Sequence, residues 1–225
     1  MKYIIMCGGK YHEIKEFRPL IKINNESLVE RTIRLLKELC VEDIAVSTGL
    51  DIDLLDFLDV PIIKFKNTYN LTSYNNGTGY WCDAFYYTDE PVCYLMGDVF
   101  YSKAALKTII DTPVNKIGFF GTDKPFAKGY FKNYEEPLAF KVEDQELLHA
   151  ACDMFRYYQD LGRDKWPFCR LPMSWELACI ICNYPLNKIV VKTPIFIGVH
   201  DFADDVDKVE EAVALEKVVK EYNIE

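Results

Sequence analysis

The sequence of 225 residues lacks any hydrophobic run long enough to cross a membrane. Its first residues also lack the basic segment followed by an apolar segment that is typical of a signal peptide. No internal repeat, low-complexity segment or linker rich in Pro, Gly and Ser interrupts the chain. We therefore expect a soluble, cytoplasmic protein that forms one domain over residues 1–225.

Positive charge is also scarce. The chain has 26 Lys and Arg against 35 Asp and Glu, which gives a net charge of −9. This balance argues against broad binding of nucleic acid, because a phosphate backbone attracts basic surfaces. An anionic small molecule would then need a local basic site or a metal ion.

Paired cysteine motifs are few. Of the eight cysteines, Cys179 and Cys182 form a C-x-x-C spacing inside an apolar run that reads as a helix. A zinc or redox pair normally comes with a second pair or with flanking turn residues. We therefore interpret these thiols as core packing, and most of the other cysteines as buried thiols in a reducing compartment.

The chain does contain a regular alternation of predicted strands and helices in its first hundred residues. The strands are expected at residues 2–6, 43–48, 61–65 and 91–96, and the helices at 27–39, 52–58 and 81–87. Ser27 and Glu30 have the spacing of a capping box. Such alternation at short spacing predicts parallel strands joined by right-handed crossovers.

The second half is less regular. We expect strands at residues 116–121 and 139–142, as an antiparallel pair, and at 189–192 and 196–199. The helices are expected at residues 145–161, 174–182 and, as an acidic C-terminal helix, 204–222.

Two of the predicted strand ends carry residues suited to binding an anion. The first strand runs into Cys7-Gly8-Gly9-Lys10, and Arg18 and Lys22 follow. Paired glycines let backbone N–H groups approach an anion closely, and three cations suit a polyphosphate. A Gly-Gly pair alone is also compatible with an ordinary strand–loop with surface charges. However, the fourth strand ends at Gly97-Asp98, and ligands of open parallel sheets bind at the carboxyl ends of strands.

The order of these features resembles the nucleotidyltransferase family of the GT-A-like α/β fold. The Asn-rich loop at residues 67–76 looks most like that of small bacterial phosphocholine cytidylyltransferases, and sugar-1-phosphate nucleotidyltransferases are similar more distantly. The resemblance implies a single Rossmann-like α/β domain with a mostly parallel central sheet and helices on both faces. Within it, residues 1–105 would bind the nucleotide, residues 123–184 would form a variable acceptor-side insertion, and residues 185–225 would supply closing strands and a C-terminal helix.

The resemblance also implies roles for individual residues. It assigns catalysis to Arg18 and Asp98, to which we add Lys22 as a further cation for the polyphosphate, and it assigns Mg²⁺ to Asp98 and Asp201, with Asp205 as a later acid of the same segment. The residues that would contact the nucleotide are Cys7, Gly8, Gly9, Lys10, Asn75 and Asn76.

The segment of residues 156–176 mixes aromatic and cationic side chains. Aromatic rings with a carboxylate can bind a quaternary ammonium head group, which would fit phosphocholine. The same rings are equally compatible with core packing, and the cations with a solvated surface. Arg170 and Glu176 are the acceptor contacts we predict from this segment.

One part of the sequence departs from the family pattern. Where the family loop commonly reads Gly-Gly-x-Gly-Thr-Arg, this chain reads Gly8-Gly9-Lys10-Tyr11-His12-Glu13. A carboxylate at Glu13 would repel a polyphosphate unless a metal ion or a lysine lies between them. Either Lys10, Arg18 and Lys22 compensate, or the donor is held differently, or the activity is lost.

The activity implied by the resemblance is transfer of a nucleotidyl group from a nucleoside triphosphate to a phosphorylated small acceptor, with release of pyrophosphate. CTP is favoured over UTP, and the acceptor would be phosphocholine or another phosphoryl metabolite used to modify a capsule or surface glycan. A phosphate nucleophile is already ionised at neutral pH, so no general base is expected. Mg²⁺ suits this chemistry because it takes oxygen ligands from carboxylates and phosphates.

Two alternatives remain open from the sequence. A GT-A glycosyltransferase would share the sheet but typically carries Asp-x-Asp, whereas this chain reads Asp98-Val99-Phe100. A non-catalytic binder of nucleotides or sugar phosphates would explain the altered loop, although it need not keep both Asp98 and Asp201. The oligomeric state is also left open, a homodimer included.

Overall fold

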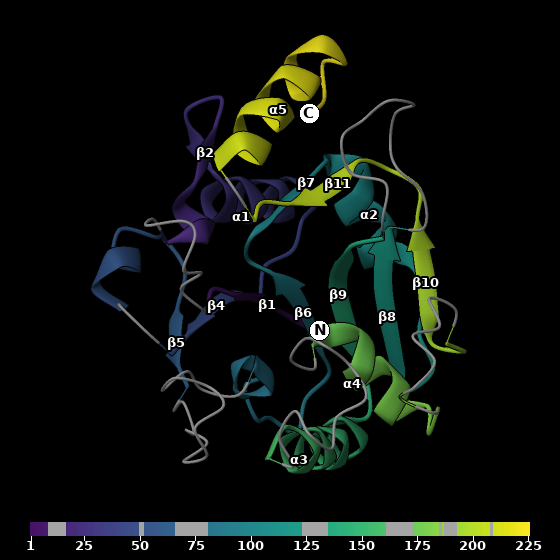
Figure 1. Ribbon diagram of the computed structural model, residues 1–225. Coiled ribbons are helices and arrows are strands. Elements are labelled where there is room, and N and C mark those ends of the chain that lie inside the picture. The colour runs from purple at the N-terminus through teal and green to yellow at the C-terminus, as the bar shows by residue number, and fades with distance from the viewer. Residues whose placement is uncertain are drawn as a thin grey trace.

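The computed structural model describes residues 1–8, 17–49, 52–65, 81–122, 135–160, 173–184, 186, 193–207 and 209–225. Within these residues, a seven-stranded sheet in the order β10-β8-β9-β6-β1-β4-β5 forms the centre (Figure 1). Strands β6, β1, β4 and β5 are parallel, as are β8 and β10, whereas β9 runs antiparallel to both of its neighbours. The predicted mostly parallel sheet is therefore confirmed, together with the antiparallel pair in the second half.

The elements have the following bounds in the described residues. The strands of the central sheet are β1 Lys2–Met6, β4 Ile44–Thr48, β5 Ile62–Lys64, β6 Val92–Met96, β8 Ile117–Thr122, β9 Pro137–Val142 and β10 Phe196–Val199. Two short ribbons pair β2 Lys22–Ile23 with β3 Glu26–Ser27, and β7 Val99–Tyr101 with β11 Ala203–Asp205. The helices are α1 Leu28–Glu38, α2 Lys103–Asp111, α3 Gln145–Asp160, α4 Ser174–Ile181 and α5 Val209–Glu221. Short 3₁₀ turns are η1 Arg18–Leu20, η2 Ile52–Leu55 and η3 Trp81–Ala84.

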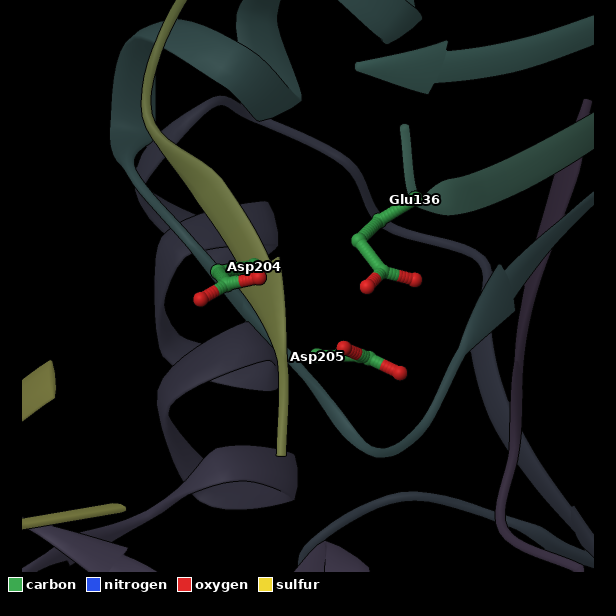
Figure 2. A group of neighbouring side chains, drawn as sticks. All are labelled: Glu136, Asp204 and Asp205. Carbon is green, nitrogen blue, oxygen red and sulfur yellow. The ribbon is translucent and has the colours of Figure 1, made fainter. Parts of the chain in front are cut away.

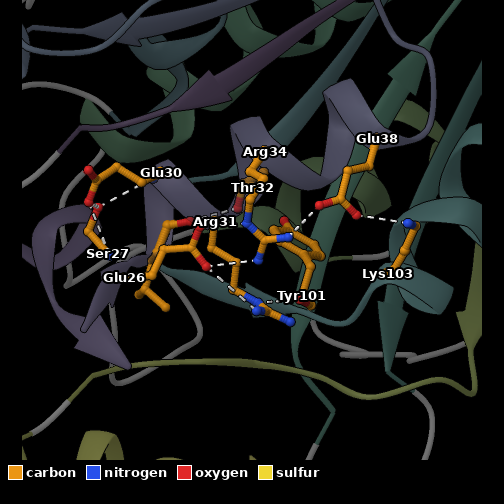
Figure 3. A network of polar contacts seen from close by, with 10 residues as sticks. Glu26, Ser27, Glu30, Arg31, Thr32, Arg34, Glu38, Tyr101 and Lys103 are labelled. Atoms are coloured by element: carbon orange, nitrogen blue, oxygen red, sulfur yellow. Dashed lines mark hydrogen bonds and ion pairs between the residues drawn. The ribbon is translucent and has the colours of Figure 1, made fainter. Parts of the chain in front are cut away.

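Helix α1 begins at the predicted capping box. The Ser27 hydroxyl accepts the backbone N–H of Glu30 at 3.3 Å, and the Glu30 carboxylate accepts the Ser27 N–H at 3.2 Å (Figure 3). Two of the backbone donors that a helix start leaves unpaired are thereby satisfied. The helix buries one face, which includes Leu28, Val29, Ile33, Leu35 and Leu36. The crossover from β1 to β4 is thus set by local residues.

Both faces of the sheet are covered, as predicted. Phe140 of β9 stacks on Phe119 of β8, and its ring packs edge-on against Phe85, which follows η3. Successive side chains of a strand point to opposite faces, so the next residue, Lys141, points away from η3. Its buried ammonium donates to the carbonyls at the end of α2, those of Ile109, Ile110 and Thr112, at 3.2, 2.8 and 2.8 Å. Helix α2 therefore lies on the face opposite η3.

Substitution of Lys141 tests this contact. Lys141→Met keeps the apolar stem but removes the donor from three carbonyls at a helix C-terminus, so we expect the free energy of unfolding to fall by about 2–4 kcal/mol. Urea unfolding measures the change. The matched control is Lys220→Met, because Lys220 pairs with Glu216 at 3.0 Å on the exposed face of α5, and we expect this substitution to cost under about 0.5 kcal/mol. Equal stability of the two variants would contradict the assigned role of Lys141.

The C-terminal helix begins later than the sequence predicts. Residues 203–205 form β11, which pairs antiparallel with β7, and helix α5 starts at Val209. The predicted helix at 204–222 is therefore wrong at its start, because a pairing between segments about a hundred residues apart overrides the local pattern. The segments at 52–55 and 81–84 are 3₁₀ turns where helices are predicted, and the predicted strand at 189–192 lies outside the described residues. None of the described helices is long and apolar enough to span a membrane.

Candidate active site

The carboxyl ends of β1 and β6 lie side by side. Met6 and Met96 are partners in this parallel pair, and the N–H of Gly97 donates to the Met6 carbonyl at 3.1 Å. A Cβ atom at Gly97 would stand 2.5 Å from that carbonyl oxygen and 2.9 Å from the Cys7 sulfur. Glycine at position 97 is therefore required by packing, and it brings the Cys7-Gly8 and Gly97-Asp98 segments together.

Gly8 is a glycine for a different reason. It is exposed, and a Cβ atom there would meet the Phe65 ring at 3.3 Å, which a small shift of that side chain relieves. Among the described residues, packing does not demand glycine at this position. A glycine at a position where the fold has room for a larger residue lets a ligand approach the backbone closely.

Arg18 is the positive group that the structure places at this edge. One guanidinium nitrogen, Nη1, lies 2.7 Å from Asp98 Oδ2 and 2.8 Å from Asp207 Oδ1. The Arg18 side chain is 13 % exposed, while the two aspartates are about a third exposed. Turn η1, with Pro19 in its first turn, fixes the backbone of Arg18. The structure thus brings Arg18 and Asp98 into contact.

Three further carboxylates form a group next to the turn that carries Asp98. Glu136 immediately precedes β9, and Asp204 and Asp205 belong to β11, and one oxygen of each lies within 4.8 Å of the others (Figure 2). Glu136 and Asp204 are buried, and Asp205 is half-buried. In the β7–β11 ribbon Asp205 pairs with Val99, and the N–H of the next residue, Val206, donates to the Asp98 carbonyl at 3.0 Å. The Asp98 turn therefore lies next to Asp205.

Asp201 lies at the other end of this ribbon. Its carboxylate accepts a hydrogen bond from the Thr108 hydroxyl of α2 at 3.0 Å, and the N–H of Ser102 donates to the Phe202 carbonyl. A strand rises about 3.3 Å per residue, so the step from Asp98 to Ser102 spans roughly 13 Å. The structure therefore does not bring together the predicted metal pair of Asp98 and Asp201. Asp205 takes the position that the sequence led us to expect for Asp201.

The other predicted site residues have varied surroundings. Lys22 is exposed on β2. Glu176 is 2 % exposed, and one oxygen of its carboxylate accepts the N–H of Met173 at 2.7 Å at the start of its own helix. The remaining predicted contacts lie outside the described residues: Gly9, Lys10, Asn75, Asn76 and Arg170.

Cys7 packs within this edge of the sheet. Its N–H donates to the Ser47 carbonyl at 2.8 Å, so that group is already used by the sheet. Burial raises the pKa of the Cys7 thiol well above its ordinary value, and the charge of Asp98 adds to the shift. The thiol is therefore neutral and poorly nucleophilic. Cys179 is likewise buried and forms no disulfide with the other described cysteines, as expected for core packing, whereas Cys182 is only half-buried.

The donor set at this edge fits a divalent cation. Glu136, Asp204 and Asp205 offer only oxygen atoms, which are the ligands that Mg²⁺ takes in proteins, and Asp205 lies next to the Asp98 turn. The convergence of these three carboxylates from β11 and the start of β9 involves segments far apart in the sequence. The sequence offered no local signal for Glu136, Asp204 or Asp207 as members of the site.

Comparisons with known proteins identify the fold. By sequence, no protein-family model and no curated protein matches the chain. Among solved structures, CTP:phosphocholine cytidylyltransferase from Streptococcus pneumoniae is similar at a TM-score of 0.55 and 13 % identity, over 97 % of this chain and 98 % of that one. The chain has the nucleotidyltransferase fold.

Two other structures support the same fold. The inositol-1-phosphate CTP transferase from T. maritima is similar at a TM-score of 0.58 and 13 % identity, over 97 % of this chain and 96 % of that one. The 2-C-methyl-D-erythritol 4-phosphate cytidylyltransferase from Thermus thermophilus is similar at a TM-score of 0.55 and 10 % identity, over 97 % and 98 %. Coverage is nearly complete in both directions, so the likeness to this fold, which is the predicted fold class, extends over nearly all of the chain.

Proposed function

We propose that the chain is a nucleotidyltransferase that joins a nucleoside triphosphate to a phosphorylated small acceptor and releases pyrophosphate. The observation that carries the proposal is the contact of Arg18 with Asp98 at the carboxyl edge of β1 and β6. This contact puts a guanidinium that is 13 % exposed and a carboxylate that is about a third exposed where open parallel sheets bind their ligands.

The proposed reaction needs charge and alignment more than proton transfer. An oxygen of the acceptor phosphate attacks the α-phosphorus, the bond from that phosphorus to the β-bridging oxygen breaks, and pyrophosphate leaves with that bond's electrons. Arg18 suits the recognition of phosphate because its planar guanidinium can donate two parallel hydrogen bonds. Holding two anions in line for this step accounts for much of the barrier reduction in such reactions.

Asp98 and Asp205 are the residues we propose as holders of Mg²⁺, with Glu136 and Asp204 as the neighbouring acids. Mg²⁺, when bound, would neutralise charge on the phosphates. In this scheme the Asp98 carboxylate contacts Arg18 in the free protein and Mg²⁺ when the cation is bound. Asp207 offers Arg18 a second carboxylate at 2.8 Å, so the guanidinium stays paired while Asp98 is engaged elsewhere.

CTP is the donor we propose, because the three similar structures described above are named for cytidylyl transfer. The acceptor is a phosphorylated small molecule, with phosphocholine as the first candidate and a role in capsule or surface-glycan modification. The glycosyltransferase alternative is less well supported, since the residue that would complete Asp-x-Asp is Phe100, which is buried against Phe202.

A substrate panel tests the proposal. CTP, UTP, ATP and GTP are each incubated with Mg²⁺ and with phosphocholine, other small phosphomonoesters or sugar-1-phosphates, and pyrophosphate is measured. We expect pyrophosphate from CTP with one class of acceptor and none when the acceptor is omitted. A folded protein that yields no pyrophosphate with any pair would contradict the proposal.

A further inference from the structure

The hydroxyl of Tyr101 joins the two chain segments that carry Asp98 and Glu136. Tyr101 ends β7 and is completely buried. Its hydroxyl donates to the Leu138 carbonyl at 2.6 Å and lies 3.2 Å from the Met96 carbonyl. Met96 stands two residues before Asp98, and Leu138 stands two residues after Glu136. β6 and β9 are already paired up to Leu95 and Ala139, and the Tyr101 hydroxyl adds a side-chain tie beyond the end of this ladder, next to the β6–β7 turn and the start of β9.

The backbone of Tyr101 also fixes the third acidic segment. Tyr101 pairs with Ala203 in the β7–β11 ribbon, and Asp204 and Asp205 follow directly. The position of β11 relative to the Asp98 turn thus depends on where Tyr101 is held. All three carboxylate-bearing segments meet at this one residue.

Arg31 holds Tyr101 from the side of α1. Its Nε donates to the Tyr101 carbonyl at 3.1 Å, as Figure 3 shows, and its guanidinium lies over the Phe100 ring at 4.2 Å from the centroid. Arg31 is itself buried, with 8 % of its surface exposed. A buried cation bonded to a strand carbonyl and stacked on the neighbouring ring leaves β7 little freedom to shift.

The Tyr101 hydroxyl acts as a donor throughout the ordinary pH range. Burial raises its pKa well above the usual value, and the charge of Asp98 adds to this shift. The bond to the Leu138 carbonyl therefore needs no change of protonation to form.

We infer that Tyr101 is a positioning residue that holds the carboxylates of Asp98, Glu136 and β11 at the separation required for a divalent cation. The inference rests on the proposed function, because it concerns the metal site of that reaction. Removal of the hydroxyl leaves the Leu138 carbonyl without this donor and removes one tie between the segments, and residues that support metal ligands commonly matter for both affinity and rate.

Tyr94 provides a matched control. It is also completely buried, and its hydroxyl donates to the Tyr86 carbonyl at 2.7 Å and lies 3.4 Å from the side chain of Gln145 in α3. These partners belong to the part of the structure next to η3 and α3, away from the acidic segments. Tyr94→Phe and Tyr101→Phe therefore remove the same group from equally buried surroundings.

The test measures Mn²⁺ binding by calorimetry and, separately, the Mg²⁺ dependence of pyrophosphate release. We expect Tyr101→Phe to weaken Mn²⁺ binding about tenfold, and to raise the Mg²⁺ concentration for half-maximal rate similarly, as for other residues that orient ligands. Tyr94→Phe should leave both within about twofold, although both variants lose a buried hydrogen bond and some thermal stability. A merely structural role would move stability in both variants and metal affinity in neither.

Each result decides one proposal. Unchanged Mn²⁺ affinity in folded Tyr101→Phe, or no saturable Mn²⁺ binding by the unmodified protein, would overturn the inference. If the protein binds Mn²⁺ tightly and Tyr101→Phe weakens this binding, but the protein releases no pyrophosphate, the proposed function is refuted and the inference on Tyr101 stands. If Tyr101→Phe does not fold, Arg31→Lys is the second variant, because it removes the guanidinium from the Tyr101 carbonyl but keeps the charge. We expect Arg31→Lys also to weaken Mn²⁺ binding. An unchanged Mn²⁺ affinity of Arg31→Lys would overturn the inference.

Discussion

Asp98→Asn is expected to lower the rate of pyrophosphate release by at least about a hundredfold, because it removes a charge that stabilises the transition state. The fold should persist, since asparagine keeps the shape of the side chain and Arg18 retains Asp207 as a partner at 2.8 Å. The measurement is the steady-state rate with CTP and the best acceptor, with circular dichroism as the check on folding. A rate within a few-fold of the unmodified protein would refute the role of Asp98.

The same assay separates the two assignments of the second acidic residue. Asp205 lies beside the Asp98 turn, whereas Asp201 bonds to Thr108 roughly 13 Å along the ribbon. We expect Asp205→Asn to lower the rate of pyrophosphate release as much as Asp98→Asn does. Asp201→Asn should lower this rate less than about threefold, because a group that makes no contact in the transition state does not change the barrier. The opposite ranking would return Asp201 to the place that the sequence resemblance implies.

Gly97→Ala is expected to lower the free energy of unfolding by about 3 kcal/mol or more, at the upper end of the usual cost of overpacking. The added Cβ would meet the backbone oxygen of Met6 at 2.5 Å, and backbone in the middle of a parallel sheet cannot turn aside as a flexible side chain can. For a chain of this length the corresponding fall in melting temperature is about 6–12 °C. Thermal unfolding followed by circular dichroism measures it.

Gly8→Ala is the matched comparison for this effect. Of the residues that the structure describes, the methyl group there would meet the ring of Phe65 alone, so the free energy of unfolding should fall by less than about 1 kcal/mol. CTP binding should nevertheless weaken, because the methyl group would stand where the backbone is expected to approach phosphate. A stable Gly97→Ala variant, or a Gly8→Ala variant with unchanged CTP affinity, would show that the two glycines have been misinterpreted.

Local signals made much of the fold predictable. Strands β1, β4 and β6 are short, apolar and bounded by polar residues, and α1 begins at a capping box that can be read directly from Ser27 and Glu30. Once these strands are taken as parallel, their carboxyl ends must share one edge, which placed Gly8 and Asp98 together. Each of these inferences depends on residues close together in the chain.

The acidic half of the site depends on contacts between distant segments and could not be read in this way. Residues 203–205 contain two acids and precede apolar residues at helical spacing. Acidic residues in this position are also typical of the first turn of a helix, so the sequence predicts a helix where the structure has β11. Its pairing with β7 is what separates Asp201 from Asp98 and places Asp205 beside it. Glu136 reaches the site because β9 inserts between β6 and β8, and Lys141 is buried because α2 ends above it. Neither residue carries a sequence signal of its own.

The fate of labelled CTP tests the central claim most directly. The protein is incubated with Mg²⁺, a phosphorylated acceptor and CTP labelled either at the α- or at the γ-phosphorus. Nucleotidyl transfer predicts that the α-label enters a new acceptor conjugate and that the γ-label leaves as pyrophosphate in equal amount. Retention of both labels in CTP with every acceptor, alongside turnover of a nucleotide sugar to a nucleoside diphosphate, would contradict the account and favour a glycosyltransferase.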